Sequence, residues 1–202
     1  MPAADPLLRL SQVAGLTAYV LLWLNVCLGL GLKTSLPLLR RWRVADLHQF
    51  TALLSLAFLG LHIAVLVHVK QQPFSLAEVL VPLLRTMPAS LGIAALYLLI
   101  LVIATSYLRR HLSVLMWRTV HALSLVAYGL GVAHALLAGP DAEMPWARLM
   151  YWSTNCVLVA LVARRAWFAH RVRRDPHRGA VANPHMPIEV VSAATQPGLN
   201  RG

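Results

Sequence analysis

The chain has 202 residues, of which 58% are hydrophobic and only 12% are charged. A soluble domain would carry about twice that share of charge, and the charge here lies between long apolar runs, as in a polytopic membrane protein. The formal net charge of +11 at pH 7 is explained by Lys and Arg near the cytoplasmic ends of membrane helices, so we expect no nucleic-acid binding.

Five apolar segments are long enough to cross a lipid bilayer, since a spanning helix needs about 20 mostly apolar residues. No Asp, Glu or Lys falls well inside any of them. The sequence therefore predicts an all-α fold, a polytopic membrane helix bundle with five transmembrane helices. The predicted spans are residues 10–32, 45–69, 89–108, 113–138 and 147–169.

The segment between the second and third spans predicts a short helix in the membrane interface. Ser75 and Glu78 have the spacing of a capping box, in which each side chain accepts a hydrogen bond from the other residue's backbone N–H. Pro82 would interrupt or end this helix, because proline lacks a backbone N–H.

Lys and Arg are divided unevenly between the two sides of the predicted bundle, and in membrane proteins they accumulate on the cytoplasmic side. Of the 18 basic residues, all but four fall on the side that holds the C-terminus. The four on the other side are Arg9, Lys70, Arg85 and Arg148. We therefore expect the N-terminus outside and the C-terminus in the cytoplasm.

Two of the predicted spans carry two histidines each: His48 and His62 on the second, His121 and His134 on the fourth. Each pair is separated by roughly 20 Å along its helix, at about 1.5 Å per residue. Both spans start in the cytoplasm, so His48 would lie at the depth of His121, and His62 at the depth of His134. A lone histidine could instead hydrogen-bond to a neighbouring helix, but four histidines matched in depth indicate two stacked metal centres.

Haem suits these histidine pairs better than zinc or copper. The spans contribute no cluster of Cys or carboxylates to complete a tetrahedral site, whereas two axial imidazoles suffice for a haem iron. No C-x-x-C-H motif occurs, which excludes covalent c-type attachment. Arg43 and Arg118 are candidate partners for the propionates of the inner haem, and Lys70, Arg85 and Arg148 for those of the outer haem. Each of these residues could equally be a solvated topology signal.

The two histidine spacings are not equivalent. On an ideal helix the His48–His62 spacing leaves two side chains about 40° apart, whereas the His121–His134 spacing, one residue shorter, leaves them about 140° apart. Either the fourth span is distorted between its histidines, where Gly129 and Gly131 would permit it, or the haems approach it from different sides. No internal repeat is obvious beyond the shared two-histidine pattern.

Two stretches carry a family resemblance: LHQFTALLSLAFLGLHIAVLVH on the second span and WRTVHALSLVAYGLGVAHALLAG on the fourth. Over about residues 43–139 the chain resembles the ferric reductase-like transmembrane domain of ferric reductases, NADPH oxidases and the haem-bearing partner of bacterial methionine sulfoxide reductase. The spacings match the family's bis-histidyl pattern, His48 and His121 as the inner pair and His62 and His134 as the outer. The resemblance implies two b-type haems and electron transfer from the cytoplasm outward.

The chain also departs from the larger members of that family. Ferric reductases and NADPH oxidases carry a cytoplasmic flavin and nicotinamide domain, whereas no G-x-G-x-x-G motif occurs here and the chain ends soon after the last predicted span. We therefore expect no FAD or NAD(P)H site in this chain. As a ferric reductase-like oxidoreductase component, it would take electrons from a cytoplasmic flavoprotein reductase, another membrane-complex subunit or a quinol.

Two other functions stay open. A structural or assembly subunit of a larger membrane complex would keep the fold with little or no redox role. A transporter or channel is disfavoured, because the spans lack the acidic residues typical of ion-coupled carriers. The terminal acceptor and the roles of His68 and His111 are also left open.

The expected organisation has three parts: an N-terminal tail over residues 1–9, the transmembrane haem-binding bundle over residues 10–169, and a basic cytoplasmic tail over residues 170–202. The last part is rich in Arg, Pro, His, Gly and Ala and lacks periodicity, so we expect it to be disordered. These features predict an integral membrane protein of the bacterial cytoplasmic membrane.

Overall fold

The computed structural model describes residues 5–31, 41–69, 74–84 and 86–174. The chain divides into two compact units, Met1–Leu158 and Val159–Gly202, and each is described by itself. Several residues named above lie outside the described ranges: Lys70, Arg85 and the part of the predicted tail beyond Arg174.

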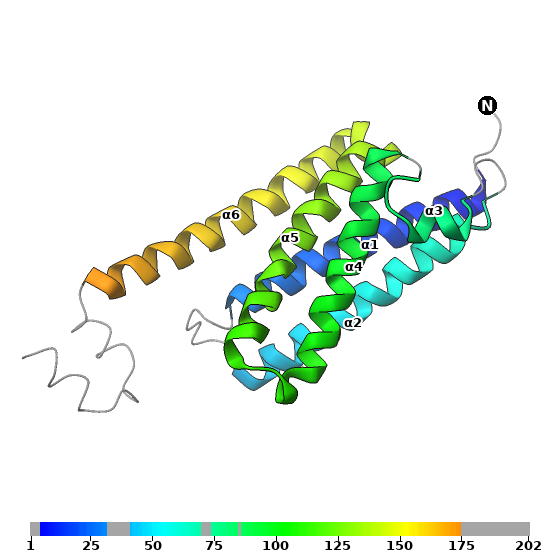
Figure 1. Ribbon diagram of the computed structural model, residues 1–202. Coiled ribbons are helices and arrows are strands. Elements are labelled where there is room, and N and C mark those ends of the chain that lie inside the picture. The colour runs from blue at the N-terminus through cyan, green and yellow to red at the C-terminus, as the bar shows by residue number, and fades with distance from the viewer. Residues whose placement is uncertain (1–4, 32–40, 70–73, 85, 175–202) are drawn as a thin grey trace, which may run out of the picture. The chain divides into compact units, whose positions relative to one another are not determined.

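Within the described ranges all regular structure is helical, as the sequence predicts (Figure 1). The long helices begin and end within a few residues of the predicted spans, except that the last continues to Arg174, inside the region predicted as a tail. The helices are α1 (Pro6–Gly31), α2 (Arg41–Leu66), α3 (Leu76–Leu80), α4 (Met87–Tyr107), η1 (Leu108–His111), α5 (Val114–Ala138), η2 (Pro140–Glu143) and α6 (Pro145–Arg174).

Four of the described helices, α1, α2, α4 and α5, are long and apolar enough to cross a membrane. The fifth predicted span, residues 147–169, forms part of α6 but does not reach the same hydropathy. Polar and charged residues explain the difference, since Arg148, Asn155 and the pair Arg164 and Arg165 interrupt its apolar sequence. A membrane protein with four candidate spanning helices is therefore established, and the fifth span is not confirmed.

The predicted short helix between the second and third spans is confirmed as α3. Ser75 is its N-cap, and the capping box with Glu78 is present in both directions. The helix ends at Val81, directly before Pro82. This segment leads into α4, and the hydroxyl of Tyr97 on α4 donates a hydrogen bond to the carbonyl of Leu80.

The spanning helices form two hairpins that face each other. Helix α1 packs along α2, and α4 packs along α5, while lesser contacts join α1 to α5 and α2 to α4 (Figure 1). The order around the bundle is therefore α1, α2, α4, α5, which places α2 diagonally opposite α5. The two histidine-bearing helices thus face each other across the centre of the bundle.

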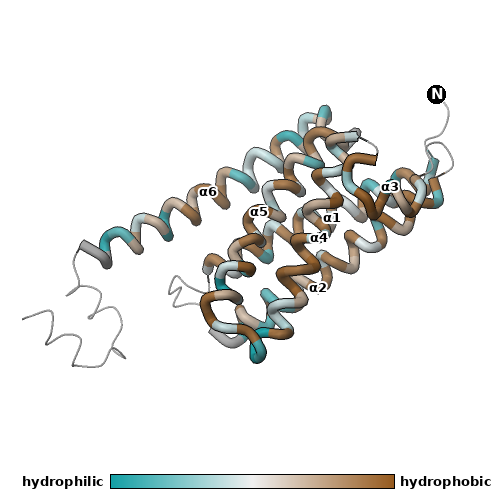
Figure 2. Tube along the Cα trace, viewed as in Figure 1, coloured by the Kyte–Doolittle hydropathy of each residue, from teal (hydrophilic) through white to brown (hydrophobic). Residues whose placement is uncertain are grey.

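Many large apolar side chains point away from this bundle. Phe50 on α2 is 60% exposed and Leu115 on α5 is 78% exposed. Soluble monomers rarely leave extended apolar surfaces in water, so these side chains suit the hydrocarbon of a bilayer. The tube of α4 is almost entirely hydrophobic, whereas hydrophilic residues recur along α6 (Figure 2).

A buried polar cluster joins the beginning of α6 to the bundle. The hydroxyl of Tyr19 on α1 hydrogen-bonds to Tyr128 on α5 (3.3 Å) and to Thr154 on α6. The hydroxyl of Tyr128 donates to Asn155 (3.4 Å), and the indole N–H of Trp23 donates to the Thr154 carbonyl (2.9 Å). Interhelical hydrogen bonds of this kind hold membrane helices together where the hydrophobic effect does not.

Candidate functional site

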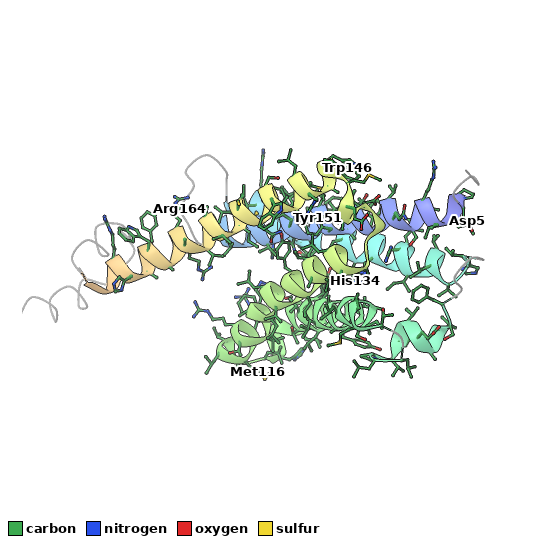
Figure 3. All side chains as sticks on the ribbon, turned by 90° about the horizontal axis from the view of Figure 1, so that it is seen from above. Asp5, Met116, His134, Trp146, Tyr151 and Arg164 are labelled. Carbon is green, nitrogen blue, oxygen red and sulfur yellow. The ribbon has the colours of Figure 1, made fainter. Side chains whose placement is uncertain are left out.

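The four histidines of the second and fourth predicted spans meet as two pairs between α2 and α5. The ring centroids of His48 and His121 are 6.0 Å apart, with an angle of 68° between the ring planes. Those of His62 and His134 are 6.5 Å apart, with an angle of 76°. Figure 3 labels His134 on α5. These are the same pairs that the sequence predicts from the depth of each histidine along its span.

These separations can be compared with the geometry of two imidazoles on one iron. A ligating imidazole nitrogen lies about 2.0 Å from a first-row metal and about 1.1 Å from its own ring centre, so two axial ligands place their centroids about 6.2 Å apart. The measured values of 6.0 Å and 6.5 Å lie on either side of this distance. Edge-to-face ring packing covers the same range, so the surroundings of the rings must distinguish the two cases.

Three of the four rings direct Nδ1 at a backbone carbonyl of the helix that precedes them in their hairpin. A carbonyl oxygen only accepts, so Nδ1 carries the proton in each case and Nε2 keeps its lone pair. Metal-ligating histidines are held in this way, with the second ring nitrogen donating to a carbonyl or carboxylate. The contacts join His48 to Asn25 (2.9 Å), His62 to Ser11 (2.7 Å) and His134 to Pro88 (2.8 Å).

The fourth ring, His121, makes a different contact. Its Nδ1 lies 3.4 Å from the hydroxyl of Ser106 on α4. That hydroxyl donates its hydrogen to the carbonyl of Val102 (2.7 Å), which leaves its oxygen as an acceptor for His121 when Nδ1 carries the proton.

Glycines on the preceding helices make room for the same three rings. A Cβ atom built at each glycine would fall at a distance from the ring that real Cβ atoms rarely or never reach, so the glycines are required by close approach. The distances to the nearest ring atom are 2.9 Å from Gly15 to His62, 3.1 Å from Gly29 to His48 and 2.8 Å from Gly92 to His134.

The unequal spacing of the histidines on α5 needs no break in the helix. Val114–Ala138 is assigned as one α-helix without interruption at Gly129 or Gly131. A Cβ at either glycine would meet no atom within 4 Å. His121 and His134 each contact a polar group of α4, and each also faces a histidine ring from α2. Both kinds of contact are possible because α5 packs along α4 and lies diagonally opposite α2.

An indole group lies beside the His48–His121 pair. Trp117 stacks on the ring of His121, with centroids 5.1 Å apart and an interplanar angle of 27°. The guanidinium of Arg109 lies over the Trp117 ring, 4.4 Å from its centroid. Trp117 Nε1 is buried without a hydrogen-bond partner among the described residues. A buried donor without a partner is costly, and a haem carboxylate would satisfy it.

The remaining described residues of the predicted site have exposed side chains. Arg43, near the start of α2, and Arg118, on α5, have exposed side chains. His68 is exposed, and its Nδ1 contacts the Ala64 carbonyl (2.7 Å). His111 is exposed in η1 and accepts a hydrogen bond from Arg110 (2.9 Å).

Each pair supplies two imidazoles, and no group of three or more His, Cys, Asp or Glu side chains comes together in the described part of the chain. A porphyrin supplies four ligands itself and takes two axial ligands from the protein. The donor set, the protonated Nδ1 atoms and the glycine contacts therefore all fit haem.

Several residues of this site are not identified by the sequence reasoning: Gly15, Gly29, Gly92, Ser106 and Trp117. One signal could have identified all of these except Trp117, because Gly15 and Gly29 are separated by the same number of residues as His48 and His62 on the next span. Gly92 and Ser106 repeat that spacing on α4. The two-histidine pattern is thus part of a repeat that covers both hairpins.

Fold and site together define a class of protein: an all-helical membrane protein whose two hairpins bring histidines into pairs at two levels. Residues 14–132 match the family described as ferric reductase like transmembrane component. The chain belongs to this family. The match includes most of α1, from residue 14 onward, which the predicted resemblance over residues 43–139 left out. It ends just before His134. No significantly similar curated protein or solved structure was found.

Proposed function

We propose that this protein is a dihaem cytochrome b subunit that transfers electrons across the membrane. His48 and His121 would hold one haem, and His62 and His134 the other. Membership of the ferric reductase-like family supports transmembrane electron transfer. The observation that carries the dihaem proposal is the pairing of four imidazoles at ligand separation, with three Nδ1 atoms directed at carbonyls.

In this proposal the protein's residues fix and tune two axial ligand pairs. When bound, haem iron supplies a one-electron couple between its ferric and ferrous forms. The carbonyls of Ser11, Asn25 and Pro88 keep the proton on Nδ1, so Nε2 is free to ligate without first losing a proton. All four histidine side chains are part-buried between the helices.

The His48–His121 site also offers donors for haem carboxylates. One such donor would be the buried N–H of Trp117, whose ring stacks on His121. Arg109 adds positive charge over the ring of that indole. Arg43 and Arg118 remain candidates for the same carboxylates, as the sequence predicts.

The direction of transfer follows from the proposed topology. Most basic residues fall on the side that holds the C-terminus, which we assign to the cytoplasm, with α6 as the fifth span. His48–His121 is then the inner site and His62–His134 the outer site. Electrons would enter from a cytoplasmic flavoprotein or quinol and leave to an external acceptor. The proposed location is the bacterial cytoplasmic membrane.

Haem stoichiometry of purified histidine variants tests this proposal. Reduced-minus-oxidised spectra with pyridine haemochrome quantitation should give two b haems per chain for the unchanged protein. His62→Ala and His121→Ala should each retain about one, because each leaves one ligand pair intact. His68→Ala is the matched control, since this histidine beyond the end of α2 is exposed and faces no second ring, and it should retain two. A folded protein without haem would favour a structural or assembly subunit instead.

A further inference from the structure

The four histidine contacts follow one geometric rule with one exception. At three sites a glycine lies against the ring, and the carbonyl one helical turn before that glycine accepts from Nδ1. The glycine–carbonyl pairs are Gly15 with Ser11, Gly29 with Asn25 and Gly92 with Pro88.

Ser106 occupies the fourth glycine position. It follows Gly92 at the spacing that separates Gly29 from Gly15, and Val102 lies one turn before it, where the rule places the accepting carbonyl. Instead of the imidazole, the Ser106 hydroxyl donates to that carbonyl, at 2.7 Å. The hydroxyl is therefore inserted between His121 and the carbonyl that would otherwise hold it.

The insertion has a register explanation. The spacing of His48 and His62 on α2 equals that of their accepting carbonyls, Asn25 and Ser11, on α1, whereas His121 and His134 are closer together by one residue. One residue is about 1.5 Å of helix rise. His121 is thus offset along α5 from the position that the rule requires, and the serine side chain bridges the offset.

The resulting hydrogen bond is weak. The distance from His121 Nδ1 to Ser106 Oγ is 3.4 Å, compared with 2.7 to 2.9 Å for the carbonyl contacts of the other three rings. Hydrogen bonds weaken at such distances. A strong bond from Nδ1–H makes an imidazole more basic and a better ligand for ferric iron. The contact with Ser106 therefore contributes less of this effect to His121 than a direct carbonyl contact would.

We propose that Ser106 is a positioning residue that makes the two haem sites unequal, raising the reduction potential of the His48–His121 site above the value that a direct carbonyl contact would give. This inference rests on the proposed function. The cation of Arg109 acts in the same direction, through the Trp117 ring that stacks on His121, because nearby positive charge disfavours the ferric form.

Redox titration of Ser106 variants tests the proposal. Ser106→Gly removes the inserted side chain and frees the Val102 carbonyl, so His121 can shift toward that carbonyl and the potential of its haem should fall. A tenfold change in the reduction equilibrium corresponds to about 59 mV for one electron. Ser106→Ala keeps the Cβ but removes the acceptor, and should shift the same potential upward. The titration step is assigned by its loss in His121→Ala.

Thr105→Ala is the matched control. Thr105 precedes Ser106 on α4 and donates to the Leu101 carbonyl at 2.7 Å in the same manner, but it contacts none of the four histidines. The control should leave both potentials unchanged. If two haems bind and neither Ser106 variant moves the assigned step, the inference is overturned while the proposed function stands. If the unchanged protein binds no haem, the proposed function fails first.

Discussion

Replacing Gly92 by alanine tests how closely the rings are held. The new Cβ would lie 2.8 Å from Nδ1, 2.9 Å from Cε1 and 3.0 Å from Cγ of His134. Ordinary carbon contacts are about 3.5 Å or longer, so the ring must move by roughly half an ångström. Such a movement strains the 2.8 Å hydrogen bond from Nδ1 to the Pro88 carbonyl and would shift the Nε2 atom that is proposed to hold a haem.

The magnitude can be set from comparable changes. Loss of a contact that orients a metal-ligating histidine costs about 10- to 100-fold in affinity, or about 1.4 to 2.7 kcal/mol. Alanine should otherwise favour the helix over glycine by about 1 kcal/mol. Gly92→Ala is therefore expected to keep the fold and to weaken one haem site selectively.

Haem transfer to an excess of apomyoglobin, followed by difference spectra, measures this loss. We expect one of two haems to leave Gly92→Ala faster than it leaves the unchanged protein. Gly131→Ala is the control, because a Cβ there meets no atom within 4 Å. Equal retention of both haems by Gly92→Ala and Gly131→Ala would refute the argument from close packing.

Two further substitutions address other contacts. Trp117→Phe keeps a ring against His121 but removes the buried N–H. We expect a small fall in the affinity of that site for haem, measured by the same haem-transfer assay. An unchanged affinity would exclude the indole as a donor to a haem carboxylate. Tyr128→Phe removes the hydrogen bonds to Tyr19 and Asn155. It should lower the free energy of unfolding in detergent by about 0.6 to 1.7 kcal/mol and leave the haem content unchanged. A loss of haem without a loss of stability would contradict a purely structural role for Tyr128.

Much of the helical architecture follows from the sequence alone. Long apolar runs must form helices in a bilayer, because unpaired backbone groups are too costly there. The depth of each histidine then follows from its position along the run, which is why His48 can be matched with His121 from the order of residues and the direction of each span. The cap at Ser75 is equally local, and it is predicted correctly.

The features that the sequence does not reveal depend on neighbours distant along the chain. Gly15 and Gly92 look like ordinary small residues of membrane helices until the ring that each one touches is known. The serine at position 106 has the same ambiguity, since helical serines commonly bond to the preceding turn. The fifth span stays unconfirmed, because polar residues such as Asn155 and Arg164 lower the hydropathy of α6.

The measurement that tests the central claim most directly is low-temperature EPR of the oxidised, purified chain. The account predicts two low-spin ferric haems per chain, each with two imidazole ligands. The angles of 68° and 76° between the paired rings predict the strongly anisotropic signals of nearly perpendicular axial ligands. A high-spin signal, or fewer than two low-spin centres in fully haem-loaded protein, would contradict the assignment of the histidine pairs.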